Sequence, residues 1–148
     1  MKKNLRYLFL FPLLLMACRK QVEDRLIGQW RLDKSYKKDL FGRDYFQTGY
    51  EDGIFHFYES GAAGYTSNTD TLSGYWEAGF YSNGNFNAAA GQSGSHREKF
   101  LRINLVNFQT NKIFYLDLDE FHYRNNWNCI RGTEHTYGRD RIYEFVKP

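Results

Sequence analysis

The sequence predicts an all-β domain in which about eight strands form an up-and-down antiparallel barrel. Composition is the first indication: the 148 residues include 13 Phe, 12 Tyr and 3 Trp, and aromatic residues favour strands. The 13 glycines suit tight turns, and no stretch repeats apolar residues at helical spacing. Closing such a meander removes its two open edges, and a barrel of about eight strands can hold one small ligand.

The expected strands show a period of two, which is the spacing of a sheet with one buried face. In the first, 28–37, Trp30, Leu32 and Tyr36 alternate with charged or polar side chains. The others are expected at 53–58, 62–67, 72–81, 98–108, 113–120, 121–130 and 139–147. The seventh is irregular, and the tripeptide Arg124-Asn125-Asn126 divides it in one interpretation.

Polar and glycine-rich segments separate these strands. Residues 22–27 suit a brief helical turn, 38–51 a loop and 131–138 a turn. The longest break, 82–96, is rich in Asn, Gly, Ala and Ser. It predicts a long loop, with at most a short strand near 86–90.

The N-terminus predicts export and lipid attachment. Basic residues at positions 2, 3 and 6 precede the apolar run Tyr7–Ala17, which is shorter than the roughly 20 residues of a bilayer span and fits a signal peptide. Leu15-Met16-Ala17-Cys18 resembles the lipobox of bacterial lipoproteins. In that family the cysteine sulfur receives a diacylglyceryl group and the chain is cut before it. A transmembrane anchor, or an ordinary signal followed by a chance cysteine, is the alternative.

The lipobox resemblance divides the chain into a signal peptide, 1–17, a lipidated tether, 18–25, and a β-domain, 26–148. It implies that the protein is held in the cell envelope by a lipid on Cys18. Arg19 stands where some inner-membrane lipoproteins carry Asp, so the resemblance favours the outer membrane. Removing the three basic residues of the signal from the total of 20 leaves 17 Lys and Arg against 17 Asp and Glu. This balance argues against nucleic acid as a partner.

The segment Leu26-Ile27-Gly28-Gln29-Trp30 resembles the Gly-x-Trp signature of the first lipocalin strand. In that family the Trp closes the base of the barrel, and an Arg near the end of the barrel packs on it. The resemblance gives these roles to Trp30 and to either Arg139 or Arg141. The family's later Thr-Asp motif and its C-terminal helix find no clear counterpart here.

Later segments resemble the hairpins of lipocalin-like lipoproteins of Gram-negative bacteria. The series runs from Phe55-His56-Phe57-Tyr58 through Gly61 and Gly64-Tyr65 to Gly74-Tyr75-Trp76. Tyr143-Glu144-Phe145-Val146 resembles their terminal strand, which pairs back to the first. The resemblance implies a lipocalin-like barrel over most of the mature chain.

Aromatic side chains are the candidate ligand contacts. Those expected to line the barrel interior are Trp30, Phe55, Phe57, Tyr65, Trp76 and Phe80. They can surround a small apolar or amphipathic ligand, which gains about 25 cal/mol per Å² of buried apolar surface, or they can fill the barrel solidly. Tyr81, Tyr123 and Trp127, expected to be exposed, suit either a sugar-stacking platform or ordinary amphipathic packing.

Enzyme, metal and cofactor signatures are absent from the sequence. The four histidines have no local metal-ligand spacing, and Asp117 and Asp119 alternate with leucines as on a solvated strand face. Gly91–Gly94 is one residue short of a nucleophile elbow. Beside the lipidated Cys18, Cys129 is the remaining cysteine, expected to be buried or else to pair with another chain.

Two functional hypotheses follow. The first is a non-enzymatic, lipid-anchored envelope lipoprotein that binds a small apolar or amphipathic ligand in its barrel. The alternative is a structural lipoprotein with a filled barrel, which docks on another envelope protein through its outer face or the 82–96 loop.

Overall fold

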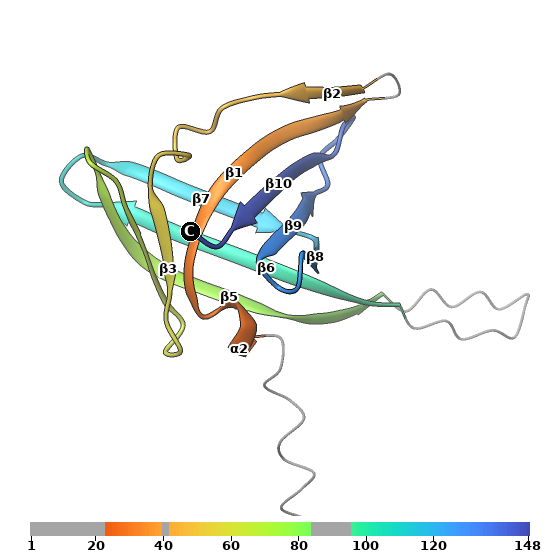
Figure 1. Ribbon diagram of the computed structural model, residues 1–148, viewed down its shortest axis with the longest axis horizontal. Coiled ribbons are helices and arrows are strands. Elements are labelled where there is room, and N and C mark those ends of the chain that lie inside the picture. The colour runs from red at the N-terminus through yellow and green to blue at the C-terminus, as the bar shows by residue number, and fades with distance from the viewer. Residues whose placement is uncertain (1–22, 40–41, 84–95) are drawn as a thin grey trace, which may run out of the picture.

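The computed structural model describes residues 23–39, 42–83 and 96–148 (Figure 1). The all-β class is confirmed in these residues, where the one helical element is the expected turn, α2 (Glu23–Leu26). No helix of the described chain has the length and apolarity to cross a membrane. Cys18, the signal peptide and the strand suggested near 86–90 lie outside the described residues.

Ten strands form one antiparallel sheet. Their bounds are β1 (Gly28–Asp39), β2 (Gly42–Tyr45), β3 (Ile54–Phe57), β4 (Ala62–Thr66), β5 (Thr71–Asn83), β6 (His96–Asn107), β7 (Lys112–Leu118), β8 (Glu120–Arg124), β9 (Cys129–Glu134) and β10 (Arg141–Val146). They lie in the order β7-β6-β5-β4-β3-β1-β10-β9-β8, with β2 also paired to β1. The expected return of the last strand to the first is confirmed, with Phe145 of β10 opposite Leu32 of β1.

β1 joins the two halves of this strongly curved sheet (Figure 1). Its first residues, from Gly28 to Trp30, pair with β3. Its later residues pair with β10 on one side and with β2 on the other. A register shift between Leu32 and Lys34, within the pairing of β1 with β10, indicates a bulge that bends the strand.

The sheet is not closed by hydrogen bonds, because its two edge strands, β7 and β8, are not paired with each other in the described chain. The two edge strands nevertheless follow one another in the sequence, with Asp119 alone between them. The Asp119 amide donates to the carbonyl of Thr133 on β9 at 2.9 Å. Gly132 faces the Leu118 side chain so closely that an added Cβ would overlap it. The end of β7 therefore packs against β9, and the chain passes directly from one edge strand to the other, while the sheet stays open between them.

Two predicted loops contain strands. β2 lies within the expected 38–51 loop, where all four of its residues are exposed and no alternation marks it. The seventh expected strand is divided into β8 and β9, and β9 extends into the expected 131–138 turn. Asn125, Asn126 and Trp127 divide it because all three adopt left-handed backbone, with φ of 49°, 50° and 72°.

Candidate functional site

Five of the six aromatic residues expected in the interior are buried, namely Trp30, Phe55, Phe57, Tyr65 and Trp76. Phe80 is the exception, with 51% of its surface exposed. Strand alternation places Phe80 on the same face of β5 as the buried Trp76 and Ala78. Because Phe80 is exposed, β5 must extend beyond the core. The expectation that Phe80 lines the barrel interior is therefore wrong.

The buried rings pack against one another. The ring centroid of Phe55 lies 4.9 Å from that of Tyr65, 5.0 Å from Phe114 and 5.5 Å from Phe145. Tyr50, from the loop before β3, adds its ring 4.7 Å from Phe114. These separations are those of direct aromatic contact, so the interior around Phe55 is occupied by side chains.

The loop that carries Tyr50 is fixed by a carboxylate. Glu51 accepts hydrogen bonds from the Thr48 amide at 2.6 Å, the Thr48 hydroxyl at 2.9 Å and the Gly49 amide at 2.9 Å. Burial acts to raise the pKa of Glu51, but these hydrogen bonds outweigh it and lower the pKa. The Tyr50 hydroxyl donates to the carbonyl of Ile113 at 3.2 Å, which ties the loop to the edge strand β7.

The cation near the signature Trp30 is Lys147, whose Nζ lies 5.3 Å from the centre of the indole ring. The alternatives Arg139 and Arg141 bind Asp39 and Glu134, at 3.5 and 3.6 Å. Arg141 pairs with Lys37, seven residues and about 20 Å along β1 from Trp30 at roughly 3.3 Å per residue. The expectation that one of these arginines packs on Trp30 is therefore wrong.

A group of aromatic and cationic side chains lies beside α2, where the described part of the chain begins. We call it the basal cluster: Arg25 (α2), Phe80 (β5), Lys99 (β6), Tyr123 (β8) and Trp127 (the β8–β9 turn). Arg25 Cζ lies 3.7 Å from the centre of the Trp127 ring. Tyr123 and Trp127 have ring centroids 5.0 Å apart, and Lys99 Nζ is 5.7 Å from the Tyr123 ring.

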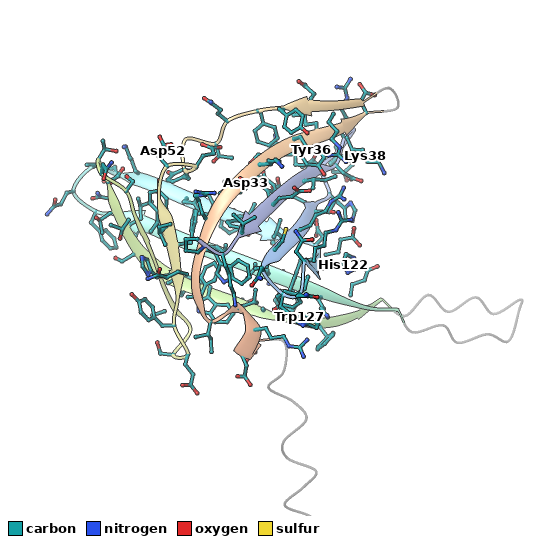
Figure 2. All side chains as sticks on the ribbon, in the orientation of Figure 1. Asp33, Tyr36, Lys38, Asp52, His122 and Trp127 are labelled. Carbon is teal, nitrogen blue, oxygen red and sulfur yellow. The ribbon has the colours of Figure 1, made fainter. Side chains whose placement is uncertain are left out.

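Local structure explains how these residues meet. Lys99 is opposite Phe80 in the β5–β6 register and shares its face of β6 with the buried Leu101 and Ile103. Trp127 is presented by the left-handed turn (Figure 2), in which the Asn128 amide donates to the Asn125 carbonyl at 3.1 Å. Left-handed backbone is rare for a bulky residue and costs on the order of 1–3 kcal/mol.

Tyr123 is half-buried, not exposed as expected, and its ring packs against the core. Burial raises the pKa of its hydroxyl far above the usual value, although Arg25 acts in the opposite direction. Tyr123 therefore keeps its proton to a more alkaline pH than an exposed tyrosine does. The rings of Tyr123 and Trp127 are in contact, whereas the side chain of Tyr81 lies outside the described part of the molecule.

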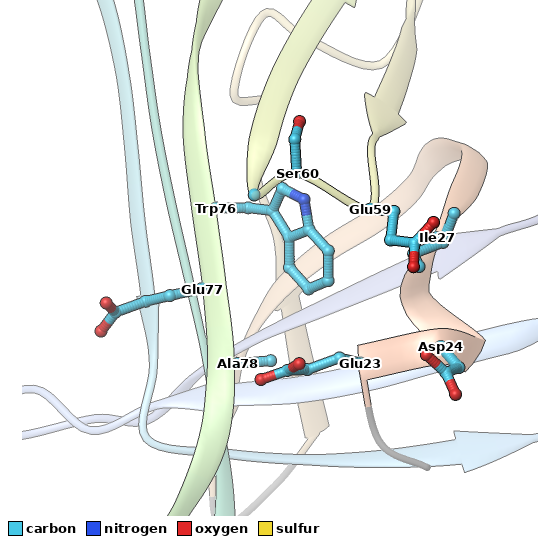
Figure 3. Close-up of a pocket in the computed structure, with 9 residues that line it drawn as sticks. Glu23, Asp24, Ile27, Glu59, Ser60, Trp76, Glu77 and Ala78 are labelled. Carbon is cyan, nitrogen blue, oxygen red and sulfur yellow. The ribbon is translucent and has the colours of Figure 1, made fainter. Parts of the chain in front are cut away.

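An acidic cleft of about 230 Å³ lies on the other side of α2 (Figure 3). Its carboxylates belong to Glu23, Asp24, Glu59 and Glu77, and Trp76 forms its apolar wall. The Trp76 Nε1 donates to the carbonyl of Tyr58 at 3.0 Å, so the indole is already satisfied. No set of three or more His, Cys, Asp or Glu side chains in the described chain is placed to hold a metal ion.

The outer face of β5, β6 and β7 is polar with scattered aromatic residues. Arg102 lies between Glu77, at 3.1 Å, and Asp117, at 3.0 Å, as expected for a solvated face. Tyr75 and Tyr115 are exposed in the neighbouring row. The single positive charge of Arg102 thus offsets one of the two carboxylates, and all three groups stay partly exposed.

Comparison with protein-family models, curated proteins and solved structures finds no match to this chain. The lipobox and lipocalin resemblances thus remain predictions. Arg25 and Lys99 were missed by the sequence reasoning, the first because it was assigned to the tether. Lys99 could have been recognised as unusual, because it is a lysine on the apolar face of the expected strand Glu98–Phe108.

Proposed function

We propose that this chain is a lipid-anchored protein of the bacterial cell envelope that binds a small amphipathic ligand and does not catalyse a reaction. The observation that supports it is the basal cluster, where the rings of Phe80 and Trp127 remain open to solvent beside two cations. The anchor is the lipid on Cys18, and the outer membrane is its proposed location. A lipocalin-like barrel, completed by the continuous β7–β8 segment, is the proposed architecture.

The chemistry of the cluster favours an amphipathic anion. Its apolar body would lie on Phe80 and Trp127, which are 51% and 45% exposed. Covering about 100 Å² on each ring contributes about 5 kcal/mol at 25 cal/mol per Å², before the entropic cost of binding. Lys99 and Arg25 would contact the anionic group, since charge-assisted hydrogen bonds are the stronger ones. The packed rings around Phe55 favour this open end over the interior.

Displacement of a fluorescent fatty acid from the processed, unacylated Cys18→Ser chain tests the proposal. Lys99→Glu and Phe80→Ala should each weaken binding of the probe by about tenfold, as loss of roughly 1.4 kcal/mol implies. Phe108→Ala is the control for Phe80→Ala, because Phe108 is 82% exposed at the opposite end of β6. Lys34→Glu is the control for Lys99→Glu, because it makes the same charge change at an exposed lysine on β1, outside the cluster. Equal affinity in all variants, or no binding at all, overturns the proposal.

A structural role is the second candidate, favoured by the packing of the interior. The partner would contact the outer face of β5, β6 and β7, where Tyr115 and Ile113 are exposed. A photocrosslinking amino acid at position 115 should then capture a specific envelope protein in intact cells. The same group at Lys34 is the control, and equal capture at both positions argues against this role.

A further inference from the structure

We infer that the base of the domain rests on the bilayer, with Trp127 and Phe80 in the lipid headgroup region. This inference rests on the lipid anchor of the proposed function. It goes beyond that function because binding of an amphipathic ligand does not require the site to touch a membrane. In the anchored protein the partner of the basal surface is a lipid bilayer, and the displacement assay without vesicles tests separately whether the surface binds a free amphipathic anion.

The length of the tether brings the base close to the membrane. Four residues, 19–22, separate Cys18 from Glu23, where α2 begins, so five Cα-to-Cα steps join the two. At no more than about 3.5 Å per residue, they span at most about 17 Å. Arg25 of α2 lies in contact with Trp127, so the aromatic part of the base is adjacent to the point where the tether enters.

The side chains at this point are of the kind found at bilayer interfaces. Trp and Tyr favour that region because one end of the side chain is apolar and the other is polar. Trp127 is 45% exposed, held by a strained left-handed turn. Arg25 and Lys99 lie against the rings of Trp127 and Tyr123, and long cationic side chains can reach phosphate groups while their stems stay on apolar surface.

The charge of the base favours neutral lipids. Glu23, Asp24 and Glu59 line the cleft on the other side of α2, so the two cations of the basal cluster are offset by acids. Arg19 and Lys20 of the tether raise the basic residues at the base to four, and Glu77 of the cleft raises the acidic ones to four. With no surplus of positive charge, adhesion depends on the apolar rings and not on anionic lipids. Contact should therefore be as good with zwitterionic as with anionic vesicles and should persist at high salt.

The opposite end of the domain should then face solvent. Phe108 follows the far end of β6, nine residues from Lys99. At roughly 3.3 Å per residue this is about 30 Å along the strand. Phe108 is 82% exposed. Like Trp127 it is an exposed aromatic residue, but it lies at the end of the domain that should not contact the membrane, so a fluorescent residue placed there serves as a control.

Tryptophan quenching by brominated lipids tests this orientation in the acylated chain reconstituted into vesicles. Of the three tryptophans, Trp30 and Trp76 are buried, so Trp127 is the one that bilayer contact can expose to bromine. Phosphatidylcholine brominated near the headgroup should remove most of the Trp127 fluorescence. The Trp127→Phe variant should lose this quenching, and replacing half of the lipid with phosphatidylglycerol should leave it unchanged.

The double variant Trp127→Phe, Phe108→Trp moves the reporter to the far end, where quenching should be absent. Equal quenching at positions 127 and 108, or none at 127, overturns the inference. The proposed ligand function is decided separately by the displacement assay, which contains no vesicles. Probe binding without quenching rejects only the membrane contact, and quenching without probe binding rejects only the ligand.

Discussion

The indole nitrogen of Trp30 donates a hydrogen bond to the carbonyl oxygen of Leu26 at 2.7 Å, and both residues are fully buried. This bond fastens α2 to the start of β1. Because Arg25 of the same helical turn packs on Trp127, the geometry of the basal cluster depends on it. Trp30 thus links the core to α2 and the basal cluster.

Trp30→Phe should destabilise the domain by about 2–4 kcal/mol, because it leaves a buried carbonyl unsatisfied and removes part of a packed ring. Urea unfolding followed by circular dichroism measures the change. Trp127→Phe is the matched control and should change the free energy of unfolding by less than about 1 kcal/mol, since its ring is half-exposed. Equal effects of the two variants contradict the structural role of Trp30.

Gly74→Ala should be among the most damaging single methyl additions in the chain. A Cβ at this position overlaps the carbonyl oxygen of Asn104 on the neighbouring strand β6, and backbone cannot yield as a side chain can. We expect a loss of about 2–3 kcal/mol in the free energy of unfolding. Gly42→Ala is the control, because nothing lies within 4 Å of its added Cβ, and a neutral Gly74→Ala contradicts the β5–β6 packing.

Glu51 should make the Thr48–Glu51 loop sensitive to acid. Its pKa in the folded protein is lowered from the ordinary value of 4.5, so the ionised carboxylate stabilises the fold above that value. The contribution is lost as pH falls through the folded pKa. Glu51→Gln should therefore cost about 1–2 kcal/mol at pH 7 and should weaken the dependence of stability on pH below 4.5.

The measurement is urea unfolding of wild type and Glu51→Gln at pH 7, 5 and 3. Glu98→Gln on β6 is the control, because it removes the same charge away from the Thr48–Glu51 loop. It should change the free energy of unfolding less than Glu51→Gln does. The interpretation is wrong if the difference between wild type and Glu51→Gln grows as the pH falls.

Cys129 should resist thiol reagents in the folded protein. It is 7% exposed, and burial raises the pKa of the thiol, which reduces the reactive thiolate fraction. In the Cys18→Ser chain it is the sole cysteine, so labelling with a chromogenic disulfide reports on it alone. We expect labelling to follow global unfolding, and rapid labelling without denaturant contradicts the burial.

Alternation along the chain was enough to predict the all-β class and most of the strands, since residues such as Trp76 and Leu116 mark the buried face directly. It could not reveal β2, which is exposed on both faces and held by backbone pairing to β1. The division of the seventh strand was predicted from Arg124-Asn125-Asn126 and is confirmed, but a period of two does not reveal the left-handed backbone of this turn.

The basal cluster needed the structure because its members come from five separate elements. The sequence marks Trp127 and Tyr123 as candidate contacts because they are aromatic, but it does not mark their cationic neighbours Arg25 and Lys99. Arg25 reads as part of a polar tether until α2 is seen to pack on the sheet. Register, which sequence leaves open, places Lys99 opposite Phe80.

Photoaffinity labelling with a diazirine-bearing fatty acid tests the central claim most directly, because it locates the bound ligand on the chain. After labelling of the processed chain and digestion, the modified peptides should contain the end of β5 around Phe80 and the turn around Trp127. Excess unlabelled fatty acid should suppress the modification. Labelling concentrated at Tyr50 and Phe114 would instead place the ligand in the interior and contradict the account.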